Sequence, residues 1–572
     1  MMELDLYQDW CKQNLEDPDL TAELANIAGD VDAIQDRFYQ NLEFGTGGLR
    51  GVIGAGTNRM NIYTVRKATQ GLANYLNEKY ENPSIAISYD SRIKSDLFAK
   101  EVARVMAANG VTAHIYAQLM PTPCLSFAVR ELKTQAGVMI TASHNPAKYN
   151  GYKAYGDDGC QMTSDAANRV LELINKVDIF EGVKMVDFDA AVAEGKIQYI
   201  KEDVIEAYYA NVAAQSIDPD AIKKANLKVV YTPLNGTGNV PVREILKRRG
   251  VENIVIVKEQ ELPDGNFPTC PFPNPEIAEA LRLGLELCKE EKPDLLLATD
   301  PDADRVGIAV PDKDGNYVLI SGNEDGAMML QYICEGRTKL GTMPKDPIAV
   351  KTIVTTEIAA AIAKDYGVQV VDVLTGFKYI GEQIHLLEEK GEENRYIFGF
   401  EESYGYLAGT YVRDKDAVVA SMLICEMAAF YKNQGKSLLD VLNGIYEKYG
   451  VYLHKQESFT CEGSAGMQRM NEIMDDLRNN PPQTIGGHKL VKFNDYGTQV
   501  SLDVATGEKT PIDLPKSNVL SFFLSDNAQV VLRPSGTEPK IKAYYTTQGA
   551  TVEDATADYK ACAVDFKEKM GF

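Results

Sequence analysis

Several patterns that mark specialised protein classes are missing from this chain of 572 residues. The nine cysteines are odd in number, are spread along the chain and form no CxxC pair. That excludes a zinc ribbon and a disulfide scaffold, and it favours a reducing compartment. Residues 1–10 carry three acidic side chains and no basic start, unlike a secretory signal peptide. The most apolar stretch, 417–431, is interrupted by Glu426 and is too short to span a bilayer, so we expect a buried helix there. We therefore predict a cytoplasmic protein.

Signals for binding nucleotides or nucleic acids are missing as well. No GKS or GKT follows the glycine-rich segment 44–51, and no GxGxxG follows a strand-like run. The formal net charge of -23 repels nucleic acid and anionic membranes, so we expect neither as a partner. The same charge would repel an anionic small molecule. A site for such a substrate must therefore gather cations locally.

The order of apolar runs and helical patterns predicts α/β domains. A strand-like run is followed by a helical pattern in three places, 84–89 with 96–109, 227–231 with 242–249, and 348–350 with 357–365. This alternation is typical of α/β domains with mainly parallel or mixed sheets. At roughly 150 residues per domain, the length predicts about four domains.

The C-terminal stretch has a different pattern. A helix is expected over 463–480, followed by strands at 489–491, 519–524 and 529–532, which indicates a smaller α+β domain. We place the domains at 1–202, 203–322, 323–452 and 453–572.

The segment Thr141-Ala142-Ser143-His144-Asn145-Pro146 carries the first chemical signal. The apolar run 137–140 precedes it, so Ser143 is expected just past a strand end, where open α/β sheets bind ligands. Ten residues later, Lys153 offers a cation that could steady a phosphoryl group or move a proton. The alternative is an ordinary polar turn followed by a solvated lysine. The residues of this segment alone do not decide between the two.

Three aspartates at every second position, Asp300, Asp302 and Asp304, follow the apolar run 295–297. If this segment is extended, the three carboxylates face one side of it. Like charges so close together are costly unless a cation lies between them, and carboxylate oxygens suit Mg²⁺. An EF-hand is excluded, because Arg305 stands where its glycine belongs and Pro311 where its final Glu belongs. A solvated acidic turn is the remaining alternative.

Three further segments could bind the polar groups of a small ligand. Arg533-Pro534-Ser535-Gly536-Thr537 follows a strand-like run and could cradle a phosphate, or it could be a hairpin turn. Glu401-Glu402-Ser403 could bind sugar hydroxyls, although a surface loop is the simpler interpretation. The glycine-rich segment 44–51 carries Arg50, which could hold a phosphate.

Taken together and in this order, the five segments resemble the motifs of the α-D-phosphohexomutase superfamily, which includes phosphoglucomutases and phosphomannomutases. The match spans residues 44–540. The resemblance implies four domains around one central cleft. The first three would be related α/β domains, and the fourth would have a TATA-binding-protein-like α+β fold.

The resemblance also implies roles for individual residues. Ser143 would be the phosphoserine that donates the phosphoryl group, and its phosphate would join Asp300, Asp302 and Asp304 in binding one Mg²⁺. His144, Lys153 and Arg50 would act in catalysis. The residues implied to bind substrate are Arg305, Lys378, Glu401, Ser403, Arg533, Ser535, Gly536 and Thr537. Glucose 1,6-bisphosphate would be both primer and intermediate in the interconversion of glucose 1-phosphate and glucose 6-phosphate.

The identity of the sugar stays open at this stage. Glu401-Glu402-Ser403 differs from phosphoglucosamine mutases, which have Gln before the Ser, and this argues against an amino sugar. The longer form, ending in Tyr404-Gly405-Tyr406, looks most like bacterial α-phosphoglucomutases of the branch that also contains phosphopentomutases. A phosphopentomutase and a phosphomannomutase are therefore alternatives. A phosphatase with a phosphoserine intermediate and a sugar-phosphate-binding protein without turnover are rivals from other classes.

Overall fold

The computed structural model describes residues 2–45, 47–461, 466–535 and 540–572. The described chain divides into two compact units, residues 1–322 with 380–435 and residues 323–379 with 436–572. The third predicted domain, 323–452, is divided between the two units. The boundaries of the four predicted domains stay a prediction.

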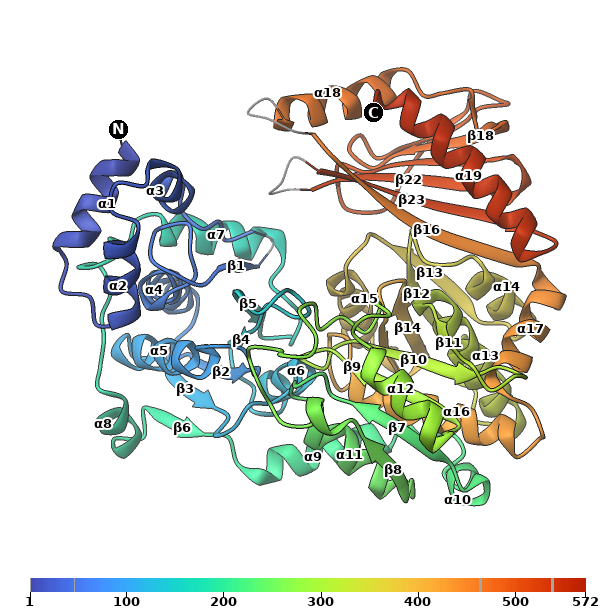
Figure 1. Ribbon diagram of the computed structural model, residues 1–572, viewed down its shortest axis with the longest axis horizontal. Coiled ribbons are helices and arrows are strands. Elements are labelled where there is room, and N and C mark those ends of the chain that lie inside the picture. The colour runs from blue at the N-terminus through green and yellow to red at the C-terminus, as the bar shows by residue number, and fades with distance from the viewer. Residues whose placement is uncertain (1, 46, 462–465, 536–539) are drawn as a thin grey trace. The chain divides into compact units, whose positions relative to one another are not determined.

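The first sheet of the first unit contains β4, the strand that the predicted serine segment follows (Figure 1). Its strand order is β1 (Gly48–Val52), β5 (Tyr149–Gly156), β4 (Ala136–Ile140), β2 (Ser84–Tyr89), β3 (Thr112–Ile115) and β6 (Ile197–Tyr199). β2 pairs in parallel with β3 and β4, whereas β5 runs antiparallel to both β4 and β1. The strand expected at 84–89 and the helix after it, α5 (Ser95–Ala108), are confirmed.

Helices cover this sheet, and three further helices at the N-terminus pack against the same apolar core. They are α4 (Ile62–Lys79), α6 (Thr122–Glu131), α7 (Ser164–Ile174), α8 (Phe188–Ala193), and the N-terminal α1 (Met2–Lys12), α2 (Pro18–Asn26) and α3 (Val31–Phe38). The N-terminal helices were not predicted. They join the apolar core through Trp10, which is 1% exposed and makes edge-to-face contacts with Phe38, Tyr63 and Phe180.

The second sheet of the first unit carries the aspartates. Its strand order is β11 (Tyr317–Ile320), β10 (Val306–Pro311), β9 (Leu295–Thr299), β7 (Lys228–Thr232) and β8 (Asn253–Ile256). Its helices are α9 (Glu202–Ala213), α10 (Ala221–Ala225), α11 (Asn239–Arg248) and α12 (Arg282–Glu291). β9 is buried along its whole length, which fits its uninterrupted apolar run.

The same unit includes β14 (Tyr396–Glu401), β15 (Gly405–Leu407) and α16 (Ala417–Lys432). β14 and β15 are antiparallel, and the turn between them contains Ser403. The buried helix expected at 417–431 is confirmed as α16. Glu426, the charge inside that helix, accepts hydrogen bonds from the backbone N–H groups of Ile217 and Asp218, so its burial is compensated.

The second unit contains β12 (Ile348–Thr352), parallel to β13 (Gln369–Val373), and a larger antiparallel sheet. The strands of that sheet run in the order β16 (Val451–Thr460), β23 (Lys540–Gly549), β22 (Gln529–Pro534), β21 (Leu520–Leu524), β18 (His488–Asp495), β19 (Val500–Asp503) and β20 (Lys509–Pro511), with β17 (Thr484–Ile485) beside β18. α19 (Val552–Lys569) packs along β23 and β16 (Figure 1). The expected α+β character of the C-terminal stretch is confirmed.

The helices of this unit include α13 (Gly322–Leu340), α14 (Ile358–Asp365), α17 (Leu438–Tyr449) and α18 (Gly466–Asn479). The division between the units falls within α15 (Phe377–Glu389), after residue 379. The helix expected at 463–480 is confirmed as α18, except that residues 463–465 lie outside the described residues. Among the helices that the structure describes, none has the length and apolar character needed to cross a membrane. All nine cysteines are free.

Candidate active site

Ser143 lies in a tight turn directly after β4. Its φ of 52° is in the left-handed region, which costs a non-glycine residue about 1–2 kcal/mol. Ser143 is only 4% exposed, and its Oγ donates a hydrogen bond to Asp300 Oδ2 at 3.0 Å. The same Oγ lies 3.1 Å from His144 Nδ1. The turn therefore points the hydroxyl at the aspartate segment, which follows a strand of the other sheet.

The aspartate segment is a closed turn after β9. Asp300 Oδ1 accepts hydrogen bonds from the backbone N–H groups of Asp304 (3.1 Å) and Arg305 (3.0 Å). The expectation that the carboxylates alternate along an extended segment is wrong, because the chain turns back and Ala303 has a φ of 48°. The turn still brings the three side chains together. One oxygen from each of Asp300, Asp302 and Asp304 lies within 4.8 Å of the other two.

The aspartate triad has the chemistry of a site for a hard metal ion. The three carboxylates are almost completely buried. Asp302 Oδ1 and Asp304 Oδ1 are buried without a hydrogen-bond partner among the described residues. A buried oxygen without a partner is costly, and a divalent cation would satisfy both oxygens at once. Burial and the neighbouring Asp302 and Asp304 raise the pKa of Asp300 well above its usual range, so the fully ionised triad needs added positive charge.

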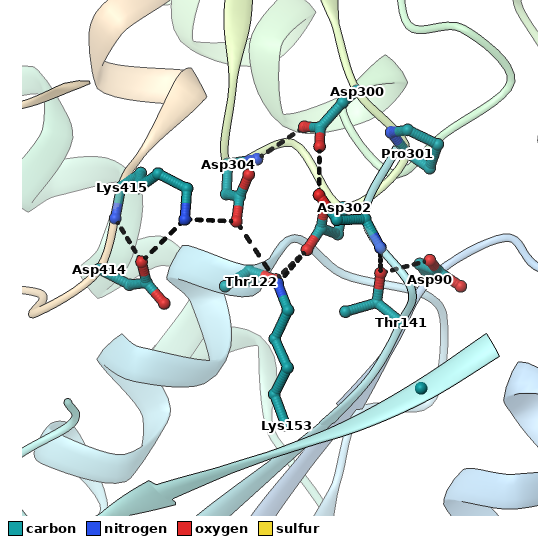
Figure 2. Close-up of polar contacts among 12 residues, drawn as sticks. Asp90, Thr122, Thr141, Lys153, Asp300, Pro301, Asp302, Asp304, Asp414 and Lys415 are labelled. Carbon is teal, nitrogen blue, oxygen red and sulfur yellow. Dashed lines mark hydrogen bonds and ion pairs between the residues drawn. The ribbon is translucent and has the colours of Figure 1, made fainter. Parts of the chain in front are cut away.

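Two largely buried lysines supply part of that charge (Figure 2). Lys153 Nζ, from β5, lies 2.8 Å from Asp302 Oδ2 and 3.5 Å from Asp304 Oδ2. Lys415 Nζ lies 3.0 Å from Asp304 Oδ2 and 3.4 Å from Asp414 Oδ1. Burial alone would lower the pKa of each lysine, but the adjacent carboxylates hold both pKa values above the ordinary one. Both lysines are therefore charged.

A glycine allows β5 to run close to the serine segment. A Cβ atom on Gly151 would lie 2.5 Å from the carbonyl oxygen of Thr141 and 2.9 Å from that of Leu49. Only glycine fits between these two backbones. Gly151 thus allows β5 to lie close to the serine segment, and Lys153, two residues further along β5, contacts the aspartates.

The loop that contains Glu401 and Ser403 is joined to the aspartate turn through the backbone. Arg305 and Gly405 form an antiparallel β-bridge, and the N–H of Val306 donates to the carbonyl of Tyr404 at 3.2 Å. Glu401 is buried, which raises its pKa, whereas Lys415 and Arg305 oppose that shift. The structure therefore brings the predicted sugar loop and the predicted metal loop together.

Arg50 and His144 also belong to this group of residues. Arg50 Nη1 donates to Asn145 Oδ1 at 3.3 Å, which connects β1 to the serine turn. Burial, with Arg305 and Arg50 nearby, holds the pKa of His144 well below its usual range. In this arrangement of charges His144 is therefore a neutral imidazole, with its Nδ1 next to Ser143 Oγ.

Comparison with known proteins identifies the family. Three models of the phosphoglucomutase/phosphomannomutase family match, α/β/α domain I over residues 41–179, domain II over 206–315 and domain III over 321–449. The chain belongs to this family. The fold class predicted from the sequence is confirmed, with three α/β/α domains and a sheet-rich C-terminal domain.

Curated relatives of this phosphoglucomutase/phosphomannomutase family member cover nearly its whole length. It is 38% identical over 520 residues to a phosphoglucomutase of Staphylococcus saprophyticus, spanning 91% of this chain and 93% of the relative. It is also 38% identical over 530 residues to a phosphoglucomutase of Staphylococcus aureus, spanning 92% and 93%.

Solved structures share the fold at lower identity. A putative phosphomannomutase from Thermus thermophilus has a TM-score of 0.69 at 21% identity, covering 93% of this chain and all of its own. The phosphoglucomutase pp63/parafusin from Paramecium has a TM-score of 0.68 at 18% identity, covering 93% and 96%.

The remaining predicted residues of this phosphoglucomutase/phosphomannomutase family member lie in the second unit. Lys378 is in α15, with its Nζ 4.9 Å from the centre of the Tyr379 ring. Arg533 is exposed near the end of β22, and the N–H of Ser535 donates to the carbonyl of Lys540 at 2.7 Å. Gly536 and Thr537 lie outside the described residues.

Sequence reasoning missed three residues of this site. Lys415 stands between two aspartates before α16, a pattern that any solvated loop could have. Thr122, at the start of α6, donates through its Oγ1 to Asp302 Oδ2 at 2.8 Å (Figure 2). Glu276 forms an ion pair with Arg305 at 2.6 Å. The Asn274-Pro275-Glu276 turn carried no signal that distinguished it from other loops.

Proposed function

We propose that this protein interconverts glucose 1-phosphate and glucose 6-phosphate through a phosphorylated Ser143. The observation that carries the proposal is the 3.0 Å contact between Ser143 Oγ and Asp300 within the buried aspartate triad. A serine hydroxyl beside three carboxylates and two charged lysines suits a phosphoryl group and a hard cation. The identity of 38% with staphylococcal phosphoglucomutases supports glucose as the sugar.

In the first half of the cycle, the phosphoryl group of phosphorylated Ser143 moves to glucose 1-phosphate. The P–Oγ bond breaks while the 6-hydroxyl oxygen of the sugar forms a new P–O bond, giving glucose 1,6-bisphosphate. The 6-hydroxyl loses a proton and Ser143 Oγ gains one, so the protons balance. We assign proton movement to His144, whose Nδ1 is 3.1 Å from Oγ, and charge stabilisation to Lys153, with Arg50 beside the turn.

In the second half, the bisphosphate turns over and its 1-phosphate returns to Ser143. Glucose 6-phosphate then leaves, and the enzyme is phosphorylated again. Glucose 1,6-bisphosphate therefore also serves as the primer for enzyme that has lost its phosphate. The reaction needs no other partner than the phosphosugar.

Asp300, Asp302 and Asp304 would hold one Mg²⁺, with the phosphate of phosphorylated Ser143 as a further ligand. When bound, the ion neutralises charge on the phosphoryl group. The buried oxygens of Asp302 and Asp304 that lack a hydrogen-bond partner among the described residues support this assignment. The residues of the chain orient the serine and exclude water from it, as the burial of Ser143 suggests.

We assign the remaining predicted residues to substrate binding. Next to Arg305, Glu401 would accept hydrogen bonds from the sugar hydroxyls, and Ser403 would add a further hydrogen bond to them. The segment Arg533-Pro534-Ser535-Gly536-Thr537 would hold the phosphate that is not being transferred, and Lys378 would also contact the substrate. A reducing, cytoplasmic location is the one we expect, in keeping with the nine free cysteines.

The proposal is tested by assaying glucose 1-phosphate, mannose 1-phosphate and ribose 1-phosphate side by side, each primed with its own bisphosphate. We expect the highest kcat/KM for glucose 1-phosphate, because a site built for pyranose hydroxyls leaves polar groups unpaired with a furanose. A higher value for ribose 1-phosphate would make the protein a phosphopentomutase. Release of inorganic phosphate in place of an isomer would make it a phosphatase.

A further inference from the structure

The turn that contains Ser143 is held from a neighbouring strand. β2 and β4 are parallel, with Tyr89 opposite Ile140, so residues 90–92 and 141–143 leave the same edge of the sheet. The N–H of Asp90 extends this pairing by donating to the carbonyl of Ile140 at 3.1 Å. The chain after β2 therefore lies directly beside the chain that turns at Ser143.

A carboxylate and a hydroxyl hold the N–H of Ser143. Thr141 Oγ1 donates to Asp90 Oδ2 at 2.6 Å (Figure 2) and accepts from the N–H of Ser143 at 2.8 Å. A hydroxyl has one proton, so the bond to Asp90 fixes its direction and leaves a lone pair for Ser143. The other oxygen of Asp90 accepts from Ser95 Oγ at 2.8 Å and from the N–H of Arg92 at 2.9 Å. Asp90 thus has a fixed orientation.

A buried guanidinium holds the carbonyl of Ser143. Arg92 Nη2 donates to the carbonyl oxygens of Ser143 and Asn145, and Nη1 donates to those of Pro146 (3.0 Å) and Tyr149 (3.1 Å). Arg92 is 3% exposed, and its guanidinium carbon lies 5.1 Å from the centre of the Phe267 ring. A lysine could not reach these carbonyls with two separate donor groups.

We propose that Asp90, Thr141 and Arg92 are positioning residues, which hold both sides of the Ser143 backbone so that its hydroxyl stays fixed through the phosphoryl transfers. The left-handed φ of Ser143 is unfavourable and persists only where the surroundings enforce it. The N–H is held by Thr141 and the carbonyl by Arg92, and both contacts come from buried side chains. The inference rests on the proposed function, because it concerns the serine that carries the phosphoryl group.

Two replacements of Thr141 separate positioning from mere packing. Thr141→Val keeps the shape but removes the hydroxyl, whereas Thr141→Ser keeps the hydroxyl. Misplacing a reacting group by about 1 Å can cost on the order of 100-fold in rate, so we expect Thr141→Val to lower kcat roughly 10- to 100-fold. KM for glucose 1-phosphate should change little, because the hydroxyl of Thr141 bonds to Asp90 and to the N–H of Ser143, which belong to the serine turn and its support. Thr141→Ser should restore most of kcat.

A matched control is available in the same domain. Thr134 is completely buried, and its Oγ1 donates to the carbonyl of Ala136 at 2.9 Å, at the opposite end of β4 from Ser143. Thr134→Val removes a buried threonine hydroxyl bond without touching the serine turn. It should lower the unfolding midpoint but leave kcat unchanged. Each variant is also incubated with glucose 1,6-bisphosphate, and the rate of phosphorylation at Ser143 is followed by intact-protein mass.

The outcomes distinguish this inference from the proposed function. If wild-type protein neither isomerises glucose 1-phosphate nor takes up a phosphoryl group on Ser143, the proposed function fails. If wild type is active and Thr141→Val keeps its kcat and phosphorylation rate, the positioning role is wrong. Asp90→Asn, which keeps the volume of the side chain, provides a second test if Thr141→Val does not fold. A wild-type phosphorylation rate in a folded Asp90→Asn variant would also contradict the inference.

Discussion

Removing Lys415 should destabilise the metal-free protein and make its stability depend on Mg²⁺. Lys415 Nζ pairs with Asp304 Oδ2 at 3.0 Å, and both side chains are largely buried. Breaking a buried ion pair by removing one partner costs about 3–5 kcal/mol. The lower end applies here, because Lys153 Nζ remains 3.5 Å from the same oxygen. We therefore expect Lys415→Met to lower the free energy of unfolding by about 3 kcal/mol in the absence of metal.

Addition of Mg²⁺ should recover much of that loss. A cation bound by the triad neutralises the carboxylates that Lys415 no longer balances, and a ligand that binds only the folded state stabilises it. The assay is thermal unfolding followed by far-ultraviolet circular dichroism, in EDTA and in Mg²⁺. The Mg²⁺-dependent rise in midpoint should be larger for Lys415→Met than for wild type.

Lys432→Met is the matched control. Lys432 pairs with Asp294 in the same unit, but both side chains are partly exposed, at 41% and 27%. A pair of this kind contributes at most about 1 kcal/mol, and it lies away from the triad. If Lys415→Met in EDTA is as stable as Lys432→Met, the reasoning about a charge-balanced triad is refuted. An equal response of both variants to Mg²⁺ would count against it in the same way.

Three further outcomes test the proposed chemistry. Ser143→Ala should abolish turnover while substrate binding survives, and near-normal activity would exclude Ser143 as the carrier. Asp302→Ala should lose most activity, as should wild type after chelation, whereas full rate without added metal would mean that the triad is not the metal site. Arg533→Ala should lower kcat/KM in both reaction directions, because each phosphate of the intermediate visits the same segment in turn. A loss in only one direction would contradict that shared use.

Much of the fold could be predicted from the sequence because local patterns were strong. β9 and α16 are both buried, and apolar runs of this kind are compatible with few places in a fold other than its core. The N-terminal helices were missed, since short amphipathic segments gain their stability from packing against the rest of the unit. Trp10, for example, is fixed by contacts with residues as distant as Phe180.

The candidate site could be predicted where several of its residues share one segment, as in Ser143 with His144 or in the three aspartates. Lys415 and Thr122 could not, because each is a single residue brought to the aspartates by the fold alone. The backbone of the aspartate turn was also predicted wrongly. Alternating carboxylates fit an extended strand and a closed turn equally well, and the hydrogen bonds to Asp300 Oδ1 select the turn.

The burial of Trp10 has a practical consequence for spectroscopy. It is the only tryptophan of the chain, and it lies between α3, α4 and the segment around Phe180. Indole fluorescence of the unmodified protein therefore reports a single location, the contact of α1 with the first domain. Detachment of the N-terminal helices would shift this emission to longer wavelength, with no label attached and no contribution from the C-terminal sheet.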